Sequence, residues 1–415
     1  MIKSLDVFLN SELAGRLSLT SSDEMVFTYS QDARRAISVS MPIKKISFGN
    51  LHCEAFFGGL LPESDEAKRA LGRRFNISAH NTFSLLSAIG AECAGALSII
   101  ETGLSAPTEA VEEVRVLPES ELAQHIRELP QRPLFIDVNG IRLSLAGFQD
   151  KAAVSRVEKG LGIPSSGPTT HILKPDLRQA PGAIFCEYLC MKTAQKLGFN
   201  VASVTLEKAE DQVYLLVERY DRRRAPITNH LERIHQEDFC QALIVSSTRK
   251  YQSDGGPKLE DCFNLLAQTA TPAKERIALL NAVAFNYLSG NMDAHAKNFS
   301  LLHHKQGIRL APMYDVLCTK AFPEFSKSMS MQIGDSYKPE EVCAHQWKLL
   351  CEDINYSYTS FKRQAKRIYT SLGAEVQQTY DEMQREGWSH PSCERAIKII
   401  QNNCELMDER LNITS

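Results

Sequence analysis

The sequence lacks the features of a membrane or secreted protein. Its first residues, MIKSLDVFLNSELAG, put Asp6 and other polar side chains where a signal peptide needs an unbroken apolar core. No apolar run approaches the roughly 20 residues that cross a bilayer. A general excess of positive charge is also missing, because 47 Lys and Arg stand against 50 Asp and Glu, for a net charge of −3. We therefore expect no membrane contact, and any contact with nucleic acid must be local.

Paired cysteine motifs and the common phosphate-loop motif are absent as well. The eleven cysteines are scattered, and the tightest pair, Cys186 and Cys190 in CEYLC, has neither a second pair nor a histidine cluster nearby. That spacing disfavours a zinc site and predicts reduced, buried thiols, as in a cytoplasmic protein. The pattern G-x-x-x-x-G-K-[ST] does not occur, which excludes a P-loop nucleotide site.

What is present is a globular composition, 43% hydrophobic and 23% charged, in a chain of 415 residues, which is too long for one ordinary core. The acidic stretch ETGLSAPTEAVEEVRVLP predicts a linker over 101–118. Before it, residues 1–100 open with a hairpin pattern, KSLDVFL and LAGRLSL. A helical stretch, EAFFGGLLPESDEAKRALGRRF, is predicted after it, and then a further helix from NTFSLLSAIG. After it, residues 119–234 are rich in strand patterns, and Asn139-Gly140 predicts a tight hairpin turn. Residues 235–415 are mainly helical.

The densest chemistry lies in LSGNMDAHAKNFSLL, between a helix pattern (ERIALLNAVAFNYL) and a strand pattern (FSLLHH). Asp293 and Asn298 have the spacing D-x-x-x-x-N, and a predicted hairpin then ends at Asp315. Kinase-like phosphotransferases have this layout: the first aspartate accepts a hydroxyl proton, and the other two side chains are hard oxygen ligands for Mg²⁺. Lys297 could neutralise charge on the transferred phosphoryl group. The alternative is a solvated turn, in which Asn and Asp are common.

The preceding half of the chain would have to supply the nucleotide contacts. Lys174 ends the strand pattern THILKP, and Glu187 follows 13 residues later on a predicted helix, as a phosphate-binding lysine and its helix carboxylate do in kinases. The alternatives are an edge-strand lysine that discourages aggregation and a glutamate on a solvated helix face. The segment LVERYD could be an adenine-binding hinge, or simply a strand that runs into the basic turn RRR. SLAGFQDK contains Gly147 and Lys151 in a turn, which is a weak phosphate-loop signal.

Six segments in order resemble the HipA family of serine/threonine kinases, the toxins of toxin–antitoxin pairs: RLSLAGFQDKAAV, TTHILKP, LVERYDRR, KYQSDGGP, MDAHAKNFSLL and APMYDV. FFGGLLPESDEAKRALGRRF and FSLLSAIGAECAGAL are similar to the family's N-terminal subdomain, so the resemblance covers about residues 1–320. It implies an α+β, bilobal protein-kinase-like fold with a mixed N-terminal subdomain and a mainly helical C-terminal lobe. Residues 119–234 would then be the nucleotide-binding lobe and residues 235–415 the catalytic lobe.

The resemblance also implies roles for the residues at matching positions. Asp293 is then the catalytic base, and Asn298 and Asp315 are the metal ligands. Ser144 falls where the family has an autophosphorylated serine whose modification displaces the phosphate loop and stops the kinase; by sequence alone it is an alternating strand residue. The residues implied to line the ATP site are Ala146, Gly147, Phe148, Gln149, Asp150, Lys151, Lys174, Glu218, Arg219, Tyr220, His295, Ala296, Lys297, Asn298, Tyr314 and Asp315.

The implied activity is phosphorylation of a serine or threonine of a protein with ATP and Mg²⁺, and the implied substrate is a translation component such as an aminoacyl-tRNA synthetase. A HipB-like helix-turn-helix antitoxin is the implied partner, and operator DNA would be reached mainly through it. Four basic residues on one helical face indicate either a solvated face or a DNA contact: Lys362, Arg363, Lys366 and Arg367. Two other functions stay open, a catalytically silent corepressor on a kinase-like scaffold and a small-molecule phosphotransferase.

Overall fold

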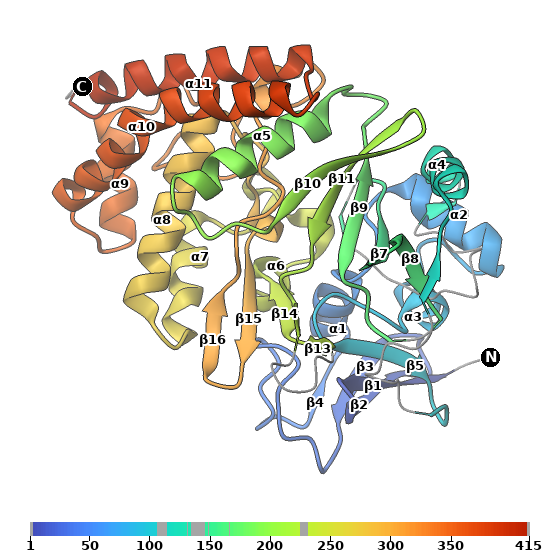
Figure 1. Cartoon of the computed structure of the whole chain (residues 1–415). Coiled ribbons are helices and arrows are strands. Elements are labelled where there is room, and N and C mark those ends of the chain that lie inside the picture. The colour runs from blue at the N-terminus through green and yellow to red at the C-terminus, as the bar shows by residue number, and fades with distance from the viewer. Residues whose placement is uncertain are drawn as a thin grey trace. The chain divides into compact units, whose positions relative to one another are not determined.

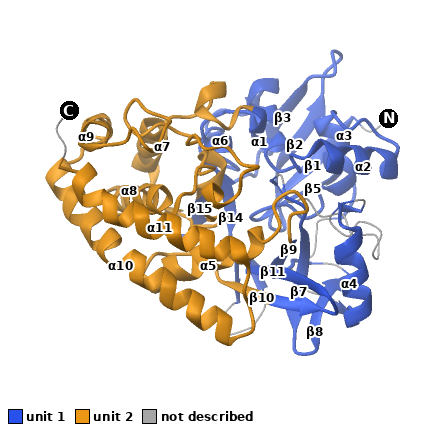
Figure 2. Ribbon diagram, turned by 90° about the horizontal axis from the view of Figure 1, so that it is seen from above, with its two compact units in different colours: residues 1–175, 207–248, 301–305 blue, residues 176–206, 249–300, 306–415 orange. Residues whose placement is uncertain are grey.

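The chain forms two compact units, each assembled from several stretches of sequence (Figure 2). Unit 1 consists of Met1–Pro175, Glu207–Thr248 and Leu301–Lys305, and unit 2 consists of Asp176–Leu206, Arg249–Ser300 and Gln306–Ser415. The structure, a computed structural model, describes residues 3–105, 114–130, 132–133, 146–147, 149–165, 167–224 and 231–412. The predicted turn at Asn139-Gly140, Ser144 and Phe148 therefore lie outside the described residues.

Unit 1 begins with a five-stranded antiparallel sheet in the order β4-β3-β2-β1-β5 (Figure 1). The predicted hairpin is confirmed, because Leu9 pairs with Glu12 across a two-residue turn. Asn10 in that turn has a φ of 57°, a left-handed conformation that asparagine tolerates. The strands are β1 (Ser4–Leu9), β2 (Glu12–Leu19), β3 (Met25–Tyr29), β4 (Ser47–Phe48) and β5 (Leu97–Glu101).

The helical stretch predicted after these strands is divided into separate helices. α1 (Asn50–Gly58) stops at a pair of glycines. α2 (Asp65–Phe75) begins after Ser64, whose hydroxyl oxygen accepts a hydrogen bond from the N–H of Ala67, so a standard N-cap fixes its start. α3 (Thr82–Ile89) is the helix predicted from NTFSLLSAIG.

The second sheet of unit 1 has six strands in the order β10-β11-β9-β7-β8-β6. β9 lies between β11 and β7, so Lys174 is on an interior strand and the edge-strand alternative is wrong. β6 falls within the predicted linker and pairs with β8. The strands are β6 (Val114–Val116), β7 (Ala152–Val157), β8 (Gly160–Pro164), β9 (His171–Pro175), β10 (Val204–Ala209) and β11 (Gln212–Glu218).

One apolar core joins the two sheets of unit 1. Its buried side chains include Phe27 and Phe56 from the N-terminal part, Leu122 from α4 (Glu119–Glu128), and Val154 and Leu216 from the second sheet. Burial of each such side chain stabilises the fold by roughly 1.5–3 kcal/mol, so the two sheets pack as one body. The predicted domain boundaries stay a prediction. The remaining elements of unit 1 are β12 (Arg222–Arg224), β13 (Leu231–Arg233), β14 (His235–Asp238) and α6 (Phe239–Ala242).

Unit 2 is mainly helical, as predicted for the C-terminal part of the chain. α10 packs against α5, α8, α9 and α11 (Figure 1). The helix predicted before the Asp293 loop is α8, which has Pro272 in its first turn and ends at Gly290, whose φ of 71° is left-handed, a common helix C-terminus. The helices are α5 (Ala183–Lys196), α7 (Leu259–Leu265), α8 (Pro272–Ser289), α9 (Ala344–Asp353), α10 (Tyr358–Arg385) and α11 (Pro391–Arg410). The two strands predicted after the loop are β15 (Ser300–His304), whose residues 301–304 belong to unit 1, and β16 (Gly307–Leu310).

Two expectations about the chain as a whole can be compared with this structure. Within the described ranges, no helix is both long enough and apolar enough to cross a bilayer. Ten of the eleven cysteines are buried, the exception being Cys343, which is partly exposed. Burial raises the pKa of the thiols of Cys53 and Cys351 to about 12, so these side chains behave as small apolar core residues.

Candidate active site

The loop that carries Asp293 is tied to the last turns of α8. The side-chain oxygen of Asn291 accepts a hydrogen bond from the N–H of Asp293 at 3.2 Å, and its amide donates to the side-chain oxygen of Asn286 at 3.0 Å. An asparagine that bonds the N–H two residues on forms an Asx turn. Because Asn291 is only 4% exposed, water competes little for these bonds, and the backbone of Asp293 is fixed relative to α8.

Met292 anchors the same loop to two later segments of unit 2. Its N–H donates to the hydroxyl of Thr319 at 2.8 Å. Its carbonyl accepts from the N–H of Ser330 at 2.9 Å and from the hydroxyl of Ser330 at 2.7 Å. Thr319 comes four residues after Asp315, so these bonds hold the segment that follows Asp315 against the loop that carries Asp293.

The carboxylate of Asp293 is accessible although its backbone is fixed. The side chain is 47% exposed. Its Oδ1 accepts a hydrogen bond from the hydroxyl of Tyr251 at 3.0 Å, and its Oδ2 lies 3.9 Å from Nε2 of His295. An accessible carboxylate on a rigid backbone is suited to accept a proton from a hydroxyl group.

The residues that follow Asp293 are buried, so this segment is not a solvated turn. His295 is 4% exposed and Lys297 is 7% exposed. Asn298 is half-buried, and its amide nitrogen donates to the carbonyl of Asp293 at 3.0 Å. The amide nitrogen is thus engaged, and the side-chain carbonyl oxygen is the group of Asn298 that could bind a metal.

Asp315 has an unusual backbone conformation. Its φ is 57°, which costs free energy for a residue with a side chain and is concentrated at functional sites. The flanking residues hold it in place: Met313 accepts from the N–H of Ala202 at 2.9 Å, and the hydroxyl of Tyr314 donates to the carbonyl of Lys297 at 2.6 Å. The tyrosine therefore links the Asp315 segment to the segment 295–298.

Asn298 and Asp315 fit the ligand preferences of Mg²⁺. Both offer hard oxygen donors, and Mg²⁺ in phosphotransferases usually takes one or two protein ligands, with phosphate and water oxygens completing its coordination. Among the described residues, no group of three or more His, Cys, Asp or Glu side chains could hold a metal by itself. A Mg²⁺ ion at Asn298 and Asp315 would therefore need phosphate or water oxygens to complete its coordination.

Glu187, on α5 of unit 2, is 3% exposed, so the solvated-face alternative is wrong. Burial of a carboxylate is costly unless it is paired or hydrogen-bonded. A buried glutamate on the helix after the Lys174 strand is consistent with the helix carboxylate of the kinase layout.

The predicted phosphate loop lies in unit 1 and depends on a glycine. Gly147 has a φ of 109°, and a Cβ atom there would lie 2.4 Å from Nζ of Lys151. Nζ of Lys151 donates to the carbonyl of Ala146 at 2.8 Å, and the amide of Gln149 donates to the carbonyl of Pro175 at 2.9 Å. The loop thus folds around a lysine and lies next to the end of β9, which carries Lys174.

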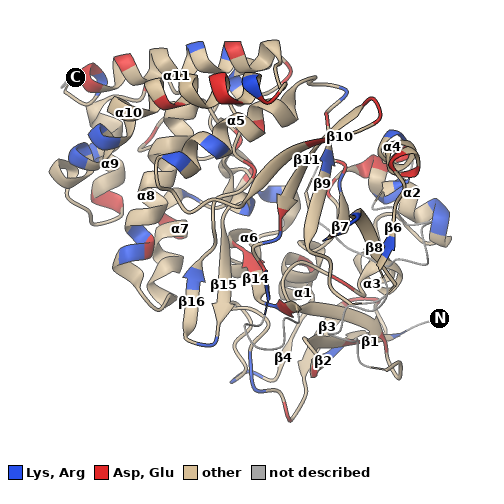
Figure 3. Cartoon of the chain, viewed as in Figure 1, with Lys and Arg blue, Asp and Glu red and all other residues tan. Residues whose placement is uncertain are grey.

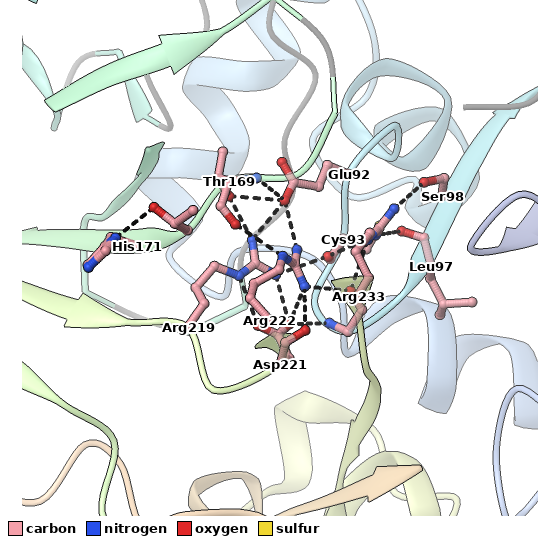
Figure 4. A network of polar contacts seen from close by, with 12 residues as sticks. Glu92, Cys93, Leu97, Ser98, Thr169, His171, Arg219, Asp221, Arg222 and Arg233 are labelled. Carbon is pink, nitrogen blue, oxygen red and sulfur yellow. Dashed lines mark hydrogen bonds and ion pairs between the residues drawn. The ribbon is translucent and has the colours of Figure 1, made fainter. Parts of the chain in front are cut away.

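The middle residue of the predicted hinge, Glu218–Tyr220, has a buried and paired side chain. Arg219 is 4% exposed, and its guanidinium bonds Glu92 at 3.0 Å and Asp221 at 2.8 Å (Figure 4). Its N–H donates to the carbonyl of Thr170. Its carbonyl accepts from the N–H of Arg222 at 3.2 Å and has one further lone pair that a nucleotide could use. Glu218 is exposed and Tyr220 is half-buried.

Glu92 accepts hydrogen bonds from several residues of this buried network. Its Oε1 accepts four hydrogen bonds, from the N–H and hydroxyl of Thr169, from Arg219 and from Arg222. Burial raises the pKa of Glu92, but the guanidinium groups of Arg219, Arg222 and Arg233 outweigh this effect and lower the pKa below its usual range. For Arg233, burial lowers the pKa to about 10.

Figure 3 marks the Lys and Arg residues of α10, including those of the predicted basic face, in blue. Arg363, Lys366 and Arg367 are exposed. Lys362 instead lies 5.4 Å from the ring centroid of Tyr358 and donates to the side chain of Asn412 at 3.4 Å. Three of the four positive charges are therefore available to a partner, and their DNA contact stays a prediction.

The chain can now be compared with known proteins. The family description "HipA-like C-terminal domain" matches residues 143–382, and "HipA N-terminal domain" matches residues 5–100. The chain belongs to the HipA family. The suspected family and the α+β protein-kinase-like fold are confirmed.

Individual relatives agree with this assignment. Y4mE of Sinorhizobium fredii, a protein provisionally named as a kinase, is 36% identical over 386 residues, which are 90% of this chain and 91% of Y4mE. The serine/threonine-protein kinase toxin HipA of Shewanella oneidensis is 28% identical over 90% of this chain and 89% of its own length. A solved structure of HipA from that organism, with HipB and operator DNA, superposes with a TM-score of 0.85 and 25% identity over 99% of this chain and 100% of HipA. The chain is therefore a kinase of the HipA serine/threonine kinase toxin family.

Several residues of the site were missed by sequence reasoning. Asn291 could have been found, because an asparagine two residues before a loop aspartate is the Asx-turn pattern. Glu92, Tyr251, Thr319 and Ser330 had no local signal, since their partners are distant in sequence: 127 residues separate Glu92 from Arg219, and 42 separate Tyr251 from Asp293.

Proposed function

We propose that this chain is an ATP- and Mg²⁺-dependent serine/threonine protein kinase that acts as the toxin of a toxin–antitoxin pair. One observation carries the proposal: the accessible carboxylate of Asp293 stands on a loop fixed by buried hydrogen bonds, with Asn298 bonded to its carbonyl. A catalytically silent scaffold would need neither the accessible carboxylate nor the rigid backbone beneath it.

The reaction is transfer of the γ-phosphoryl group of ATP to a hydroxyl group of the protein substrate. The hydroxyl oxygen forms a bond to the γ-phosphorus, and the bond between that phosphorus and the bridging oxygen of ADP breaks. Asp293 accepts the proton of the attacking hydroxyl. Mg²⁺ held by Asn298 and Asp315 would supply positive charge at the phosphates. Lys297, on the same short segment as Asp293, would balance negative charge on the transferred group.

Unit 1 contributes the nucleotide-binding part of the proposal. Lys151 and Lys174 bind phosphate oxygens, and Gly147, whose φ of 109° favours glycine, would let backbone N–H groups of its loop approach them. The backbone of Glu218–Tyr220 would bind the adenine edge. Arg219 serves this role through its carbonyl, since its side chain is held by Glu92 and Asp221.

The partners proposed for this chain come from the family. The similar HipA of Shewanella oneidensis was solved with HipB and operator DNA, which supports a HipB-like helix-turn-helix antitoxin here, with DNA reached mainly through it. A protein of the translation apparatus, such as an aminoacyl-tRNA synthetase, is the proposed substrate. Phosphorylation of Ser144 would inactivate the kinase, and we propose a cytoplasmic location.

The test is phosphate transfer from ATP with a radiolabelled γ-phosphate. Purified protein, first treated with a phosphatase that is then removed, is incubated with and without Mg²⁺, alone and with a cell lysate. We expect Mg²⁺-dependent label on serine or threonine of the chain itself and of at least one lysate protein. Asp293→Asn should lose this labelling by several orders of magnitude and still bind ATP, whereas the control Asp353→Asn, at an exposed position of α9, should keep it.

Each alternative function predicts another result. A silent corepressor would transfer no label from wild-type protein to any acceptor, although it would still bind an antitoxin. A small-molecule phosphotransferase would label only low-molecular-weight components of the lysate. Undiminished labelling by Asp293→Asn would place the base elsewhere.

A further inference from the structure

The motif KYQSDGGP has no role in the function proposed above, yet its backbone is held tightly. Gln252–Asp254 form a 3-10 turn, after which the N–H of Gly256 returns to the carbonyl of Tyr251 at 2.9 Å. A Cβ atom on Gly256 would lie 2.6 Å from that carbonyl oxygen and 2.3 Å from the carbonyl oxygen of Arg249. The glycine is therefore required for the turn to close, and the closed turn fixes the backbone of Tyr251.

A second set of bonds connects this turn to the catalytic loop. The N–H of Gln252 donates to the carbonyl of Ser330 at 3.1 Å. The side chains of Gln252 and Gln332 bond each other at 2.6 Å, and the N–H of Gln332 donates to the side-chain oxygen of Gln252 at 2.8 Å. Ser330 in turn donates twice to the carbonyl of Met292, the residue before Asp293. Tyr251 and Asp293 thus share one rigid support.

The side chain of Tyr251 ends at the carboxylate of Asp293. Its hydroxyl donates to Oδ1 at 3.0 Å. Its ring packs edge-on against His295, with centroids 5.3 Å apart and an interplanar angle of 76°, and Nζ of Lys250 lies 5.3 Å from the ring centroid. The contacts with His295 and Lys250 restrict rotation of the ring, and they therefore fix the direction in which the hydroxyl points.

We infer that Tyr251 is a positioning residue for the base and that KYQSDGGP exists to present it. The torsion of a carboxylate about its last bond is broad, and the Asp293 side chain is 47% exposed, so a donor on a rigid turn narrows the orientations that the carboxylate can adopt. The bond from Tyr251 holds Oδ1, and we assign receipt of the proton of the substrate hydroxyl to Oδ2. A misplacement of about 1 Å in a catalytic group can cost about a hundredfold in rate. This inference rests on the proposed function.

The first test replaces Tyr251 with phenylalanine, which keeps the ring contacts and removes only the donor. We expect the kcat for phosphate transfer to fall by about tenfold to a hundredfold, while the KM for ATP changes by less than about twofold. The matched control is Tyr369→Phe, which removes another tyrosine-to-aspartate hydrogen bond, the one to Asp408 at 2.5 Å, between α10 and α11. It should leave both constants unchanged. The acceptor is the one that wild-type protein labels, and thermal unfolding of each variant verifies its fold.

The second test asks whether Tyr251 acts through Asp293. Single-turnover transfer is measured for Tyr251→Phe, Asp293→Asn and the double variant. If Tyr251 only orients the carboxylate, the double variant should be no slower than Asp293→Asn. A double variant slower by the full factor seen for Tyr251→Phe alone would overturn the inference, as would an unchanged kcat for Tyr251→Phe. Activity retained by Asp293→Asn would overturn the proposed function itself, which is a separate result.

Discussion

Replacement of Glu92 by glutamine perturbs the most heavily bonded carboxylate of unit 1. The buried network around it contains three arginines, Arg219, Arg222 and Arg233, and two carboxylates, Glu92 and Asp221 (Figure 4). These formal charges sum to +1, and loss of the Glu92 charge raises the sum to +2. The side chains of Arg219 and Arg222 are each 2% exposed, so water cannot compensate.

The expected loss of stability follows from this burial. Breaking a buried ion pair by removing one partner costs about 3–5 kcal/mol, because the other charge stays buried without compensation. Glutamine keeps one oxygen, which can still accept from Thr169, so we expect the lower end, about 3 kcal/mol in the free energy of unfolding. The matched control is Glu232→Gln, which removes the ion pair with Arg223; these side chains are 33% and 54% exposed, and exposed pairs contribute about 0–1 kcal/mol.

The assay is urea unfolding followed by circular dichroism, with both variants compared with wild-type protein. The reasoning would be refuted if Glu92→Gln shifted the free energy of unfolding no more than Glu232→Gln does. That result would mean that the arginines find other partners or water when the charge of Glu92 is removed.

The same experiment has a predicted pH dependence. Arg219, Arg222 and Arg233 lower the pKa of Glu92 despite its burial, and burial of Asp221 is likewise outweighed by Arg219 and Arg222, which lower its pKa. A carboxylate whose folded-state pKa lies below its unfolded value, about 4.3 for glutamate, stabilises the fold above that value. The contribution is lost as the pH falls through the folded-state pKa. The stability difference between wild type and Glu92→Gln should therefore be constant near neutral pH and shrink in acid below about pH 4; a difference that grew in acid would contradict the assigned pKa direction.

Three further predictions concern the nucleotide. Asp315→Ala should abolish the Mg²⁺-dependent part of ATP binding, measured by calorimetry; equal affinity with and without the substitution would remove Asp315 from the metal site. Gly147→Ala should weaken ATP binding at least tenfold, because a φ of 109° is strained for any residue with a Cβ atom, and the added methyl group would displace Nζ of Lys151, 2.4 Å away; unchanged affinity would exclude this loop from the site. Incubation with ATP and Mg²⁺ should add one phosphate at Ser144 and lower ATP affinity, since about −1.5 to −2 charges there repel the ATP phosphates; mass spectrometry that found an active kinase with unmodified Ser144 would refute the switch, and Ser144→Ala should keep its affinity.

The elements around the site could be predicted because their signals are local. The helix period of ERIALLNAVAFNYL and the apolar run after it fixed α8 and β15, and an Asn-containing two-residue turn fixed the first hairpin. Hydrophobic periodicity and turn chemistry depend only on neighbouring residues. The break between α1 and α2 also has local causes, namely two glycines, a proline and the N-cap Ser64. A single helical stretch was nevertheless expected.

The choice between alternatives at single residues required the tertiary structure. The local sequence around Lys174 is the same whether its strand lies at the edge or in the interior of a sheet. Only the strand order shows that the strand is interior. The local sequence around Glu187 is compatible with a surface position, but the packing of α5 buries this residue. The local sequence predicts Arg219 as a hinge residue, but Glu92, from the segment between α3 and β5, holds its side chain.

The sequence by itself determined which side chains we propose for phosphoryl transfer, because the spacing of Asp293, Asn298 and Asp315 is a property of the chain. Only the tertiary structure decided how the proposed base is held. The bond from Tyr251 to Asp293 spans 42 residues, and it forms because KYQSDGGP and the catalytic loop both bond to the segment 330–332. Such pairings depend on the positions of three distant segments at once, and no local pattern of residues encodes them.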